Sequence, residues 1–371
     1  MRLSAIYPAA VATAVLAGCA GPPPAAPDPS GQANADMNRV LTALASMNPK
    51  PIETLTPDEA RQQPTAAMAA IAVQQQTTGS AAPLPVASVQ DITVPGAAGP
   101  LPARIYNPGT GQHPPLPVIV YFGGGGWVIA NNLDTYDASA RALATGTTAI
   151  VVSVLYRHGP ETRFPGAHDD AIAAYRWAVS NAARLGGDPA RIALAGESAG
   201  GSLALATAIY ARDNHWPMPK AELLIYPVAG TGTDTPSARE YRNAKPLNTA
   251  MLPWFLRYYG TGNTDALKDP RLDPVETADL HGLPPTTVVL AQIDPLRSGG
   301  EMLADKMRST GDDVAVRVFP GVTHEFFGMG SVVAEAKGAE DYATQHLVAQ
   351  LGPYVPQAMP QPSRARRPVR R

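Results

Sequence analysis

Ser198 is the residue whose surroundings suggest covalent chemistry most directly. It stands at the centre of G-E-S-A-G-G (196–201), a G-x-S-x-G pattern with one further glycine. Residues 191–195 before it, apolar after Arg191, predict a short buried strand, and residues 202–210 after it predict an apolar helix. A serine on such a sharp strand-to-helix turn presents its hydroxyl beyond the sheet edge, beside a helix N-terminus that favours developing negative charge. A capping serine in an ordinary turn would share the pattern, but this setting favours a nucleophile.

A nucleophilic serine needs a base and an orienting acid, and the chain after Ser198 offers one well-placed pair. Asp294 follows an apolar stretch that predicts a strand, and His324 follows the next predicted strand. In an open α/β sheet such strand ends share one edge, where ligands bind. Asp269 and Asp273 are alternative acids, but they follow no predicted strand. The other histidines lie in loops, precede Asp294 or fall on a late predicted helix, and they are His113, His158, His168, His215, His281 and His346.

A glycine-rich loop supplies candidate donors for an oxyanion. Residues 123–127 read G-G-G-G-W and follow the predicted strand 117–122. Glycines let backbone N–H groups approach an oxygen without a Cβ in the way, and the N–H of Ala199 is a further donor beside the nucleophile. A phosphate-binding loop is excluded because no G-K-[ST] follows the glycines.

Charge and composition narrow the class of protein. The chain has 371 residues and a formal net charge of −2, so nothing in its overall charge favours nucleic acid as a partner. Its single cysteine, Cys19, excludes an intramolecular disulfide. The chemistry expected of Ser198 needs neither a metal nor a cofactor. The oligomeric state stays open.

The two ends of the chain differ in composition from the rest. Residues 3–17 are mainly apolar, too short for a comfortable transmembrane helix, and end in L-A-G-C at Cys19. This end resembles the lipobox of bacterial lipoproteins, which implies a signal peptide over 1–18, lipidation of Cys19 and an exported protein anchored to a membrane of the cell envelope. Residues 19–35 predict a flexible tether, and the Pro- and Arg-rich residues 356–371 a disordered basic tail.

Two regions between these ends have different patterns. Residues 36–88 predict helices, from the apolar spacing between Met37 and Met47 and the cap signal that begins at Thr56. These helices could fold back over the sheet as a lid. Residues 89–355 alternate between strand and helix patterns, which predicts an α/β fold with a mostly parallel, doubly wound sheet.

The predicted strands are 89–94, 103–106, 117–122, 149–156, 191–195, 222–228, 286–293 and 314–319, the first two as a hairpin, and the predicted helices include 169–181 and others from about Gly299 and Gly338. Residues 231–262 interrupt the alternation with an apolar, aromatic helix over 251–259. We interpret this segment as a cap insertion near the substrate, although a buried structural helix would show the same pattern.

Taken together, these motifs resemble the hormone-sensitive-lipase-like bacterial esterases, family IV of the α/β-hydrolase superfamily. The resemblance covers about residues 36–355 and rests on 123–127, Y-R-H-G-P-E at 156–161, G-E-S-A-G-G, D-P-L at 294–296 and the late His324. It implies an α/β-hydrolase fold with helices on both faces of the sheet and a helical cap. It also implies a triad of Ser198, Asp294 and His324, and an oxyanion hole formed by Gly125, Gly126 and Ala199.

One residue departs from the family pattern. The family has a histidine where this chain has Gly123, and that side chain normally helps to hold the loop. Each glycine costs about 0.5–1 kcal/mol in conformational entropy relative to alanine, so we expect a looser loop with its backbone donors retained.

These observations favour a serine carboxylic ester hydrolase that acts on small acyl esters with short to medium chains. Two alternatives remain. One is a non-catalytic protein that binds a small molecule on a hydrolase scaffold, suggested by Gly123. The other is an amidase or deacetylase that uses the same triad.

Overall fold

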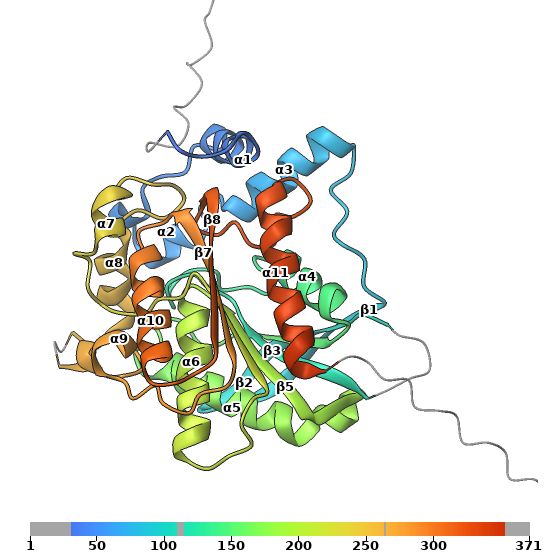
Figure 1. Ribbon diagram of the computed structural model, residues 1–371. Coiled ribbons are helices and arrows are strands. Elements are labelled where there is room, and N and C mark those ends of the chain that lie inside the picture. Colours follow the sequence, from blue (N-terminus) through green and yellow to red (C-terminus); the bar gives the residue numbers. More distant parts are fainter. Residues whose placement is uncertain (1–30, 110–114, 263–264, 353–371) are drawn as a thin grey trace, which may run out of the picture.

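A single mixed sheet organises the chain. The computed structural model describes residues 31–109, 115–262 and 265–352, so the predicted signal peptide, Cys19 and the basic tail lie outside the described residues. Within these ranges the sheet has eight strands in the order β1-β2-β4-β3-β5-β6-β7-β8 (Figure 1). The strands are β1 Ser88–Gly96, β2 Gly99–Asn107, β3 Leu116–Phe122, β4 Ile150–Val154, β5 Gly187–Glu197, β6 Ala221–Ile225, β7 Thr286–Ile293 and β8 Val314–Thr323.

The pairing confirms a mostly parallel sheet. β1 and β2 form the predicted antiparallel hairpin, and β2 is also antiparallel to β4. All pairs from β4 to β8 are parallel. The carboxyl ends of β5, β7 and β8 therefore meet at one edge, where Ser198, Asp294 and His324 follow.

Helices cover both faces of this sheet and one of its edges. α4 and α11 cover one face, while α5, α6 and α10 cover the other (Figure 1). α1, α2 and α3 precede the sheet and lie within residues 36–88 or at their start, where the N-terminal cap is predicted. The helices are α1 Ala35–Ser46, α2 Pro57–Ala60, α3 Ala66–Thr78, α4 Asp137–Thr147, α5 Gly166–Asn181, α6 Ala199–Asp213, α7 Pro236–Glu240, α8 Met251–Tyr259, α9 Pro274–Thr277, α10 Arg297–Ser309 and α11 Ala334–Leu351, with short 3-10 turns at Ile52–Thr54, Ala182–Leu185 and Ala266–Lys268. In the described part of the chain, no helix is long and apolar enough to span a bilayer.

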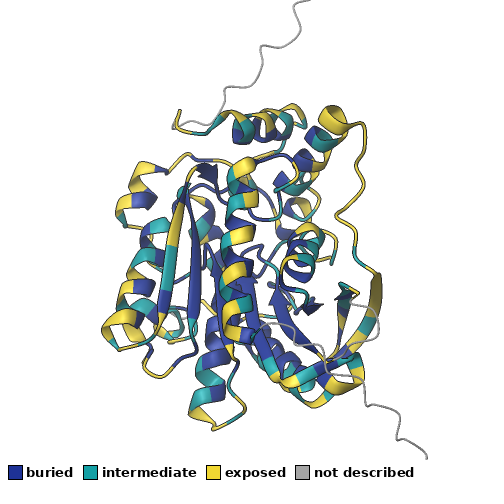
Figure 2. Ribbon diagram, turned by 45° about the vertical axis from the view of Figure 1, so that its right-hand side comes forward, coloured by how far each residue is buried: buried dark blue, intermediate teal, exposed yellow. Residues whose placement is uncertain are grey.

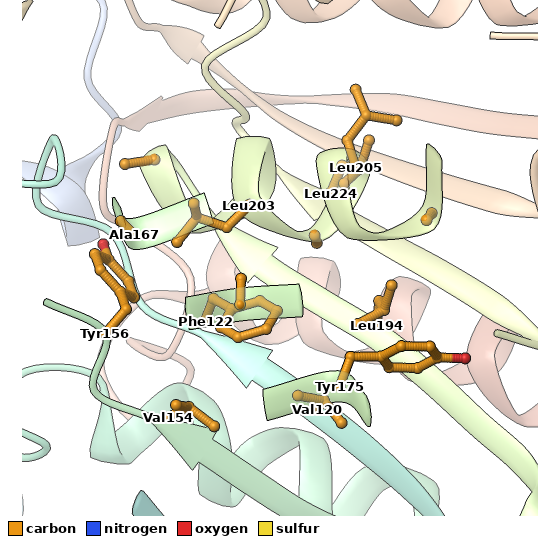
Figure 3. Close-up of a cluster of buried hydrophobic side chains, with 14 of the residues drawn as sticks. Val120, Phe122, Val154, Tyr156, Ala167, Tyr175, Leu194, Leu203, Leu205 and Leu224 are labelled. Carbon is orange, nitrogen blue, oxygen red and sulfur yellow. The ribbon is translucent and has the colours of Figure 1, made fainter. Parts of the chain in front are cut away.

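Side chains along β3 point alternately to the two faces of the sheet, and each face carries its own hydrophobic core. Every residue of β3 is buried (Figure 2). Val120 and Phe122 point into the core beneath α5 and α6 (Figure 3), whereas Ile119 and Tyr121 belong to the core beneath α4 and α11. Successive side chains of a strand point to opposite faces, so a strand covered on both faces is apolar throughout.

Polar contacts join the cap to α8 and to the loops that follow β3 and β4. The N-cap predicted at Thr56 is present and forms a capping box, in which Thr56 and Glu59 accept hydrogen bonds from each other's backbone N–H groups. One turn later, Arg61 Nε donates to the carbonyl of Val128 over 2.9 Å, and Arg61 Nη2 lies 2.7 Å from Glu161 Oε2. The predicted helix 251–259 also joins the cap, because Trp254 Nε1 donates to the carbonyl of Leu55 over 2.9 Å.

Some predicted boundaries are wrong. β6 ends at Ile225 and not at residue 228, because Tyr226 takes a φ of 36° and Pro227 has no N–H to donate to a strand. β4 ends at Val154 rather than at residue 156: Leu155 N–H still donates to the carbonyl of Pro102, its partner in register on β2, but Pro102 has no N–H to return the bond. Helix α4 was not predicted as an element, since Tyr136 at its N-cap supplies no side-chain cap to signal the start.

The carboxyl group of Glu222 on β6 is buried with too few hydrogen-bond donors around it to stabilise its charged form. Oε2 lies 3.2 Å from Thr286 Oγ1, but the single proton of that hydroxyl has a nearer acceptor, the carbonyl of Pro284 at 2.8 Å. Oε1 has no partner within the described residues. Burial raises the pKa of Glu222 to about 8. The protonated carboxyl, donating to Thr286 Oγ1, therefore fits this site better than the carboxylate.

We predict that Glu222→Gln changes the pH dependence of stability. Between the ordinary pKa of 4.5 and about 8, the unfolded wild type loses the Glu222 proton while the folded protein keeps it. The wild-type free energy of unfolding should therefore fall relative to that of the variant as the pH rises through this window, by at most about 1.4 kcal/mol per pH unit. Thermal unfolding of both proteins across this window measures the difference. Parallel curves would contradict the prediction.

Candidate active site

The turn between β5 and α6 holds Ser198 in a strained conformation. Its φ is 55° and its ψ is −118°, values that a non-glycine residue rarely adopts. A Cβ on Gly196 would lie 2.1 Å from the carbonyl oxygen of Gly200, and a Cβ on Gly200 would lie 2.0 Å from that of Phe122. Neither position admits a side chain. Although Ser198 is the N-cap of α6, its side chain makes no capping bond, which leaves the hydroxyl for other partners.

The structure brings Ser198, His324 and Asp294 together as expected from their order. His324 Nε2 lies 3.0 Å from Ser198 Oγ, and His324 Nδ1 lies 2.7 Å from Asp294 Oδ2. Asp294 is held in turn by the N–H of Leu296, which donates to Oδ1 over 2.8 Å. All three side chains are buried. The arrangement can pass a proton from the serine hydroxyl to an imidazole whose other nitrogen is fixed by a carboxylate.

The alternative acids and bases lie elsewhere. Asp269 forms an ion pair with Arg271, 2.8 Å away, and Asp273 accepts a weak bond from Thr231. His168 is buried and its Nδ1 lies 2.8 Å from the Tyr259 hydroxyl. None of these groups contacts Ser198 in the described structure.

Charged neighbours tune the histidine. Burial alone would lower the pKa of His324, but the charge and hydrogen bond of Asp294, helped by Glu325 and Glu197, raise it above its ordinary value. Asp294 thus stabilises the imidazolium that forms when His324 accepts a proton. Activity that depends on neutral His324 as a base would be lost as the pH falls through this raised pKa.

A buried carboxyl beside the serine organises the ring of His324. Glu197 is inaccessible to solvent and accepts hydrogen bonds from the hydroxyls of Tyr121 and Tyr226. Its burial raises its pKa to about 7. The ring centroid of Tyr226 lies 4.6 Å from that of His324. Glu197 therefore fixes a tyrosine that packs against the imidazole, a role that we did not assign to it from the sequence.

The glycine loop after β3 has free donors near Ser198. Among the described residues, the backbone N–H groups of Gly125, Gly126 and Ala199 have no acceptor. Gly125 and Gly126 have φ values of 98° and 58°, in the region that favours glycine. A Cβ on Gly126 would also lie 2.2 Å from the Phe255 ring of α8. These groups can donate to an anionic oxygen formed beside Ser198.

Two tyrosines hold this loop where the related family has a histidine. The Tyr156 hydroxyl lies 3.0 Å from the carbonyl oxygens of both Gly123 and Gly124. The Tyr136 ring fills the space beside Gly123, since a Cβ there would lie 2.6 Å from Tyr136 Cδ2. The looser loop that we expected from Gly123 is therefore braced from outside. The quoted motif at 156–161 contains Tyr156, but only the fold shows what its hydroxyl reaches.

A cavity of about 710 Å³ opens onto Ser198 and His324. Its walls come from the N-terminal cap, the glycine loop and α8, so the segment 231–262 does contribute to the space above Ser198. Met251 and Phe255 of α8 face the cavity, while Trp254 and Tyr259 are buried in the core, so both interpretations of this helix hold in part. The described residues contain no group of three or more His, Cys, Asp or Glu side chains that could hold a metal ion.

A mostly parallel sheet with Ser, Asp and His at its carboxyl edge, under a helical cap, is the architecture of an α/β hydrolase. Comparison with known proteins agrees. Residues 119–328 match the model of a family described as having the alpha/beta hydrolase fold. The chain belongs to this family.

Named relatives and solved structures are similar over most of the chain. Carboxylesterase NlhH of Mycobacterium tuberculosis is 41% identical over 243 residues, which cover 64% of this chain and 76% of that protein. Ethyl acetate hydrolase of Pseudomonas putida is 35% identical, covering 77% and 88%. An esterase of Pyrobaculum calidifontis superposes with a TM-score of 0.73 at 36% identity, covering 80% of this chain and 94% of that one.

We predict that Tyr156→Phe lowers kcat roughly tenfold with little change in KM, because the loop it holds serves mainly the transition state. Steady-state kinetics on a soluble ester measure both constants. Tyr175→Phe is the matched control, since it removes a tyrosine hydroxyl that donates to the carbonyl of Pro217 over 2.8 Å, away from the cavity. Equal losses in the two variants, or a change confined to KM, would contradict the prediction.

Proposed function

We propose that this protein hydrolyses carboxylic esters through an acyl-enzyme on Ser198. The observation that carries the proposal is the hydrogen-bonded chain from Ser198 Oγ through His324 to Asp294, with distances of 3.0 and 2.7 Å, at the base of a cavity. The names of the relatives support ester hydrolysis as the reaction. The protein is therefore assigned as a serine ester hydrolase.

The geometry supports an ordered sequence of proton and acyl transfers. Ser198 Oγ attacks the ester carbonyl carbon while His324 Nε2 takes the hydroxyl proton, and the carbonyl electron pair moves to oxygen. The N–H groups of Gly125, Gly126 and Ala199 donate to that oxyanion. As the oxyanion collapses, His324 gives its proton to the departing alcohol. Water, deprotonated by His324, then attacks the acyl carbonyl carbon, and His324 returns that proton to Ser198 Oγ as the acid is released.

The volume and lining of the cavity limit the size of the ester that can bind. A volume of about 710 Å³ lies within the usual range of small-molecule sites, and its apolar lining comes largely from α1, α3 and α8. Esters with short to medium acyl chains fill such a space. Leu41, Leu44 and Met251 are among the apolar residues that would contact the chain.

We predict that Ser198→Ala lowers kcat/KM by a factor of about 10³ or more on the preferred ester. The measurement is hydrolysis of p-nitrophenyl esters from acetate to palmitate, with activity highest at short to medium chains. Ser202→Ala is a matched control one turn along α6, where the hydroxyl donates to the carbonyl of Arg271 over 3.1 Å. Undiminished hydrolysis by the Ser198 variant would exclude the mechanism. Saturable ligand binding without turnover in the wild type would favour the non-catalytic alternative.

We also propose that the protein is an exported lipoprotein anchored through Cys19. The support is the sequence alone: a mainly apolar stretch over 3–17 followed by L-A-G-C at Cys19, the single cysteine of the chain. Several acyl chains on one residue would hold the protein on a membrane of the cell envelope.

We predict that wild-type protein made in a bacterial host partitions into a detergent phase and incorporates labelled palmitate, and that Cys19→Ser does neither. Phase separation of whole-cell extracts, followed by immunoblotting, measures the partition. Ester hydrolysis in the same fractions reports whether each protein is folded. Identical partition of the two proteins would rule out the lipid anchor.

A further inference from the structure

Glu325 follows His324 in the chain, and its carboxylate has no hydrogen-bond or ion-pair partner among the described residues. It lines the same cavity as Ser198 and His324. Within the described ranges the carboxylate makes neither a hydrogen bond nor an ion pair. Its oxygens are not among the buried unpartnered atoms, so they are open to the cavity rather than sealed in the core.

The other charged groups around the cavity do not neutralise this carboxylate. Arg61 forms an ion pair with Glu161 at 2.7 Å, and Asp134 forms one with Arg104, also at 2.7 Å. Lys50 and Lys245 line the cavity but are exposed to solvent and form no ion pair with Glu325 among the described residues. Burial raises the pKa of Glu325, and the charge of the neighbouring His324 offsets this rise only in part.

The position of Glu325 relates it to one half of the substrate. In the proposed reaction His324 delivers its proton to the departing alcohol, so the alcohol half of the ester lies on the His324 side of the cavity. A carboxylate adjacent to His324 and open to the cavity therefore meets the alcohol half rather than the acyl chain. A carboxylate accepts hydrogen bonds and attracts positive charge.

We propose that Glu325 is a specificity-determining residue that selects esters whose alcohol half carries a positive charge or a hydrogen-bond donor. The proposal rests on the ester hydrolysis proposed above and names the substrate class for that site. An ammonium or hydroxyl group supplies the partner that the protein does not, and an anionic alcohol half is repelled. A partly enclosed cavity strengthens this discrimination relative to water.

Two pairs of butyrate esters test the proposal. Butyrylcholine is compared with its neutral isostere, in which carbon replaces the nitrogen, and glycol monobutyrate is compared with propyl butyrate. The first pair isolates charge and the second isolates hydrogen-bond donation. The wild type should prefer the charged or donating member of a pair by roughly tenfold in kcat/KM. Because each comparison is a ratio, a change common to both esters cancels.

In Glu325→Gln the preference for the charged ester should fall toward one, since the variant keeps the shape and loses the charge, while its amide oxygen still accepts a hydrogen bond from glycol monobutyrate. Glu276→Gln is the matched control, because Glu276 lies exposed on α9 outside the cavity, and it should keep the wild-type ratios. Glu325→Gly is a second variant that also removes the carboxylate and suits the backbone, since residue 325 has a φ of 65°. It should lose the preference in both pairs, because it removes the acceptor oxygens together with the charge.

Two results would overturn the proposal. One is a wild-type ratio near one in both pairs with all esters hydrolysed, which leaves the ester hydrolase intact and removes the role of Glu325. The other is a wild-type preference that survives in both Glu325 variants. Failure of the wild type to hydrolyse any of the four esters, together with the p-nitrophenyl series, would instead contradict the ester hydrolase itself, and this proposal with it.

Discussion

The turn at Ser198 is the constraint on which the arrangement of the site depends. A non-glycine residue at a φ of 55° is strained, and the strain persists because the surroundings leave no alternative. The same turn requires α6 to begin against the end of β3, where a Cβ on Gly200 would lie 2.0 Å from the carbonyl oxygen of Phe122. The glycine loop starts immediately after Phe122. One close approach therefore places both the serine hydroxyl and the free N–H groups.

The imidazole is positioned from the other side by the end of β6. The N–H of Ser198 donates to the carbonyl of Ile225 over 2.9 Å, which ties the turn to this strand. Tyr226 then leaves the sheet, bonds to the buried Glu197 and packs against His324. Asp294 raises the pKa of that histidine despite its burial. Packing thus sets the direction of the ring, and the carboxyl groups of Asp294, Glu325 and Glu197 raise its basicity.

Local patterns predicted the parts of this site that depend on chain order. Ser198, Asp294 and His324 could be chosen because each follows a strand, and parallel strands end at one edge. The apolar face of α1 and the N-cap at Thr56 could also be predicted, since both are short-range signals. The hairpin β1–β2 was found for the same reason.

Contacts between residues far apart in the chain could not be predicted in this way. Tyr156 reaches the glycine loop and Tyr226 reaches Glu197 only after the sheet has formed, and neither contact leaves a periodic trace in the sequence. The early end of β6 depends on a positive φ at Tyr226, which cannot be predicted from the residue type. The open carboxylate of Glu325 likewise becomes visible only when the cavity is in place.

The most direct test of Ser198 as the activated nucleophile is to find the site of covalent attack by a fluorophosphonate. This reagent reacts with a serine only when the base and the oxyanion donors are assembled around it. Intact-mass analysis of the wild type should show one adduct, and peptide mapping should place it on Ser198. His324→Ala should leave the protein folded and largely unlabelled. An adduct on another residue, or labelling of the wild type no faster than that of the His324 variant, would contradict the roles of Ser198 as nucleophile and His324 as its base.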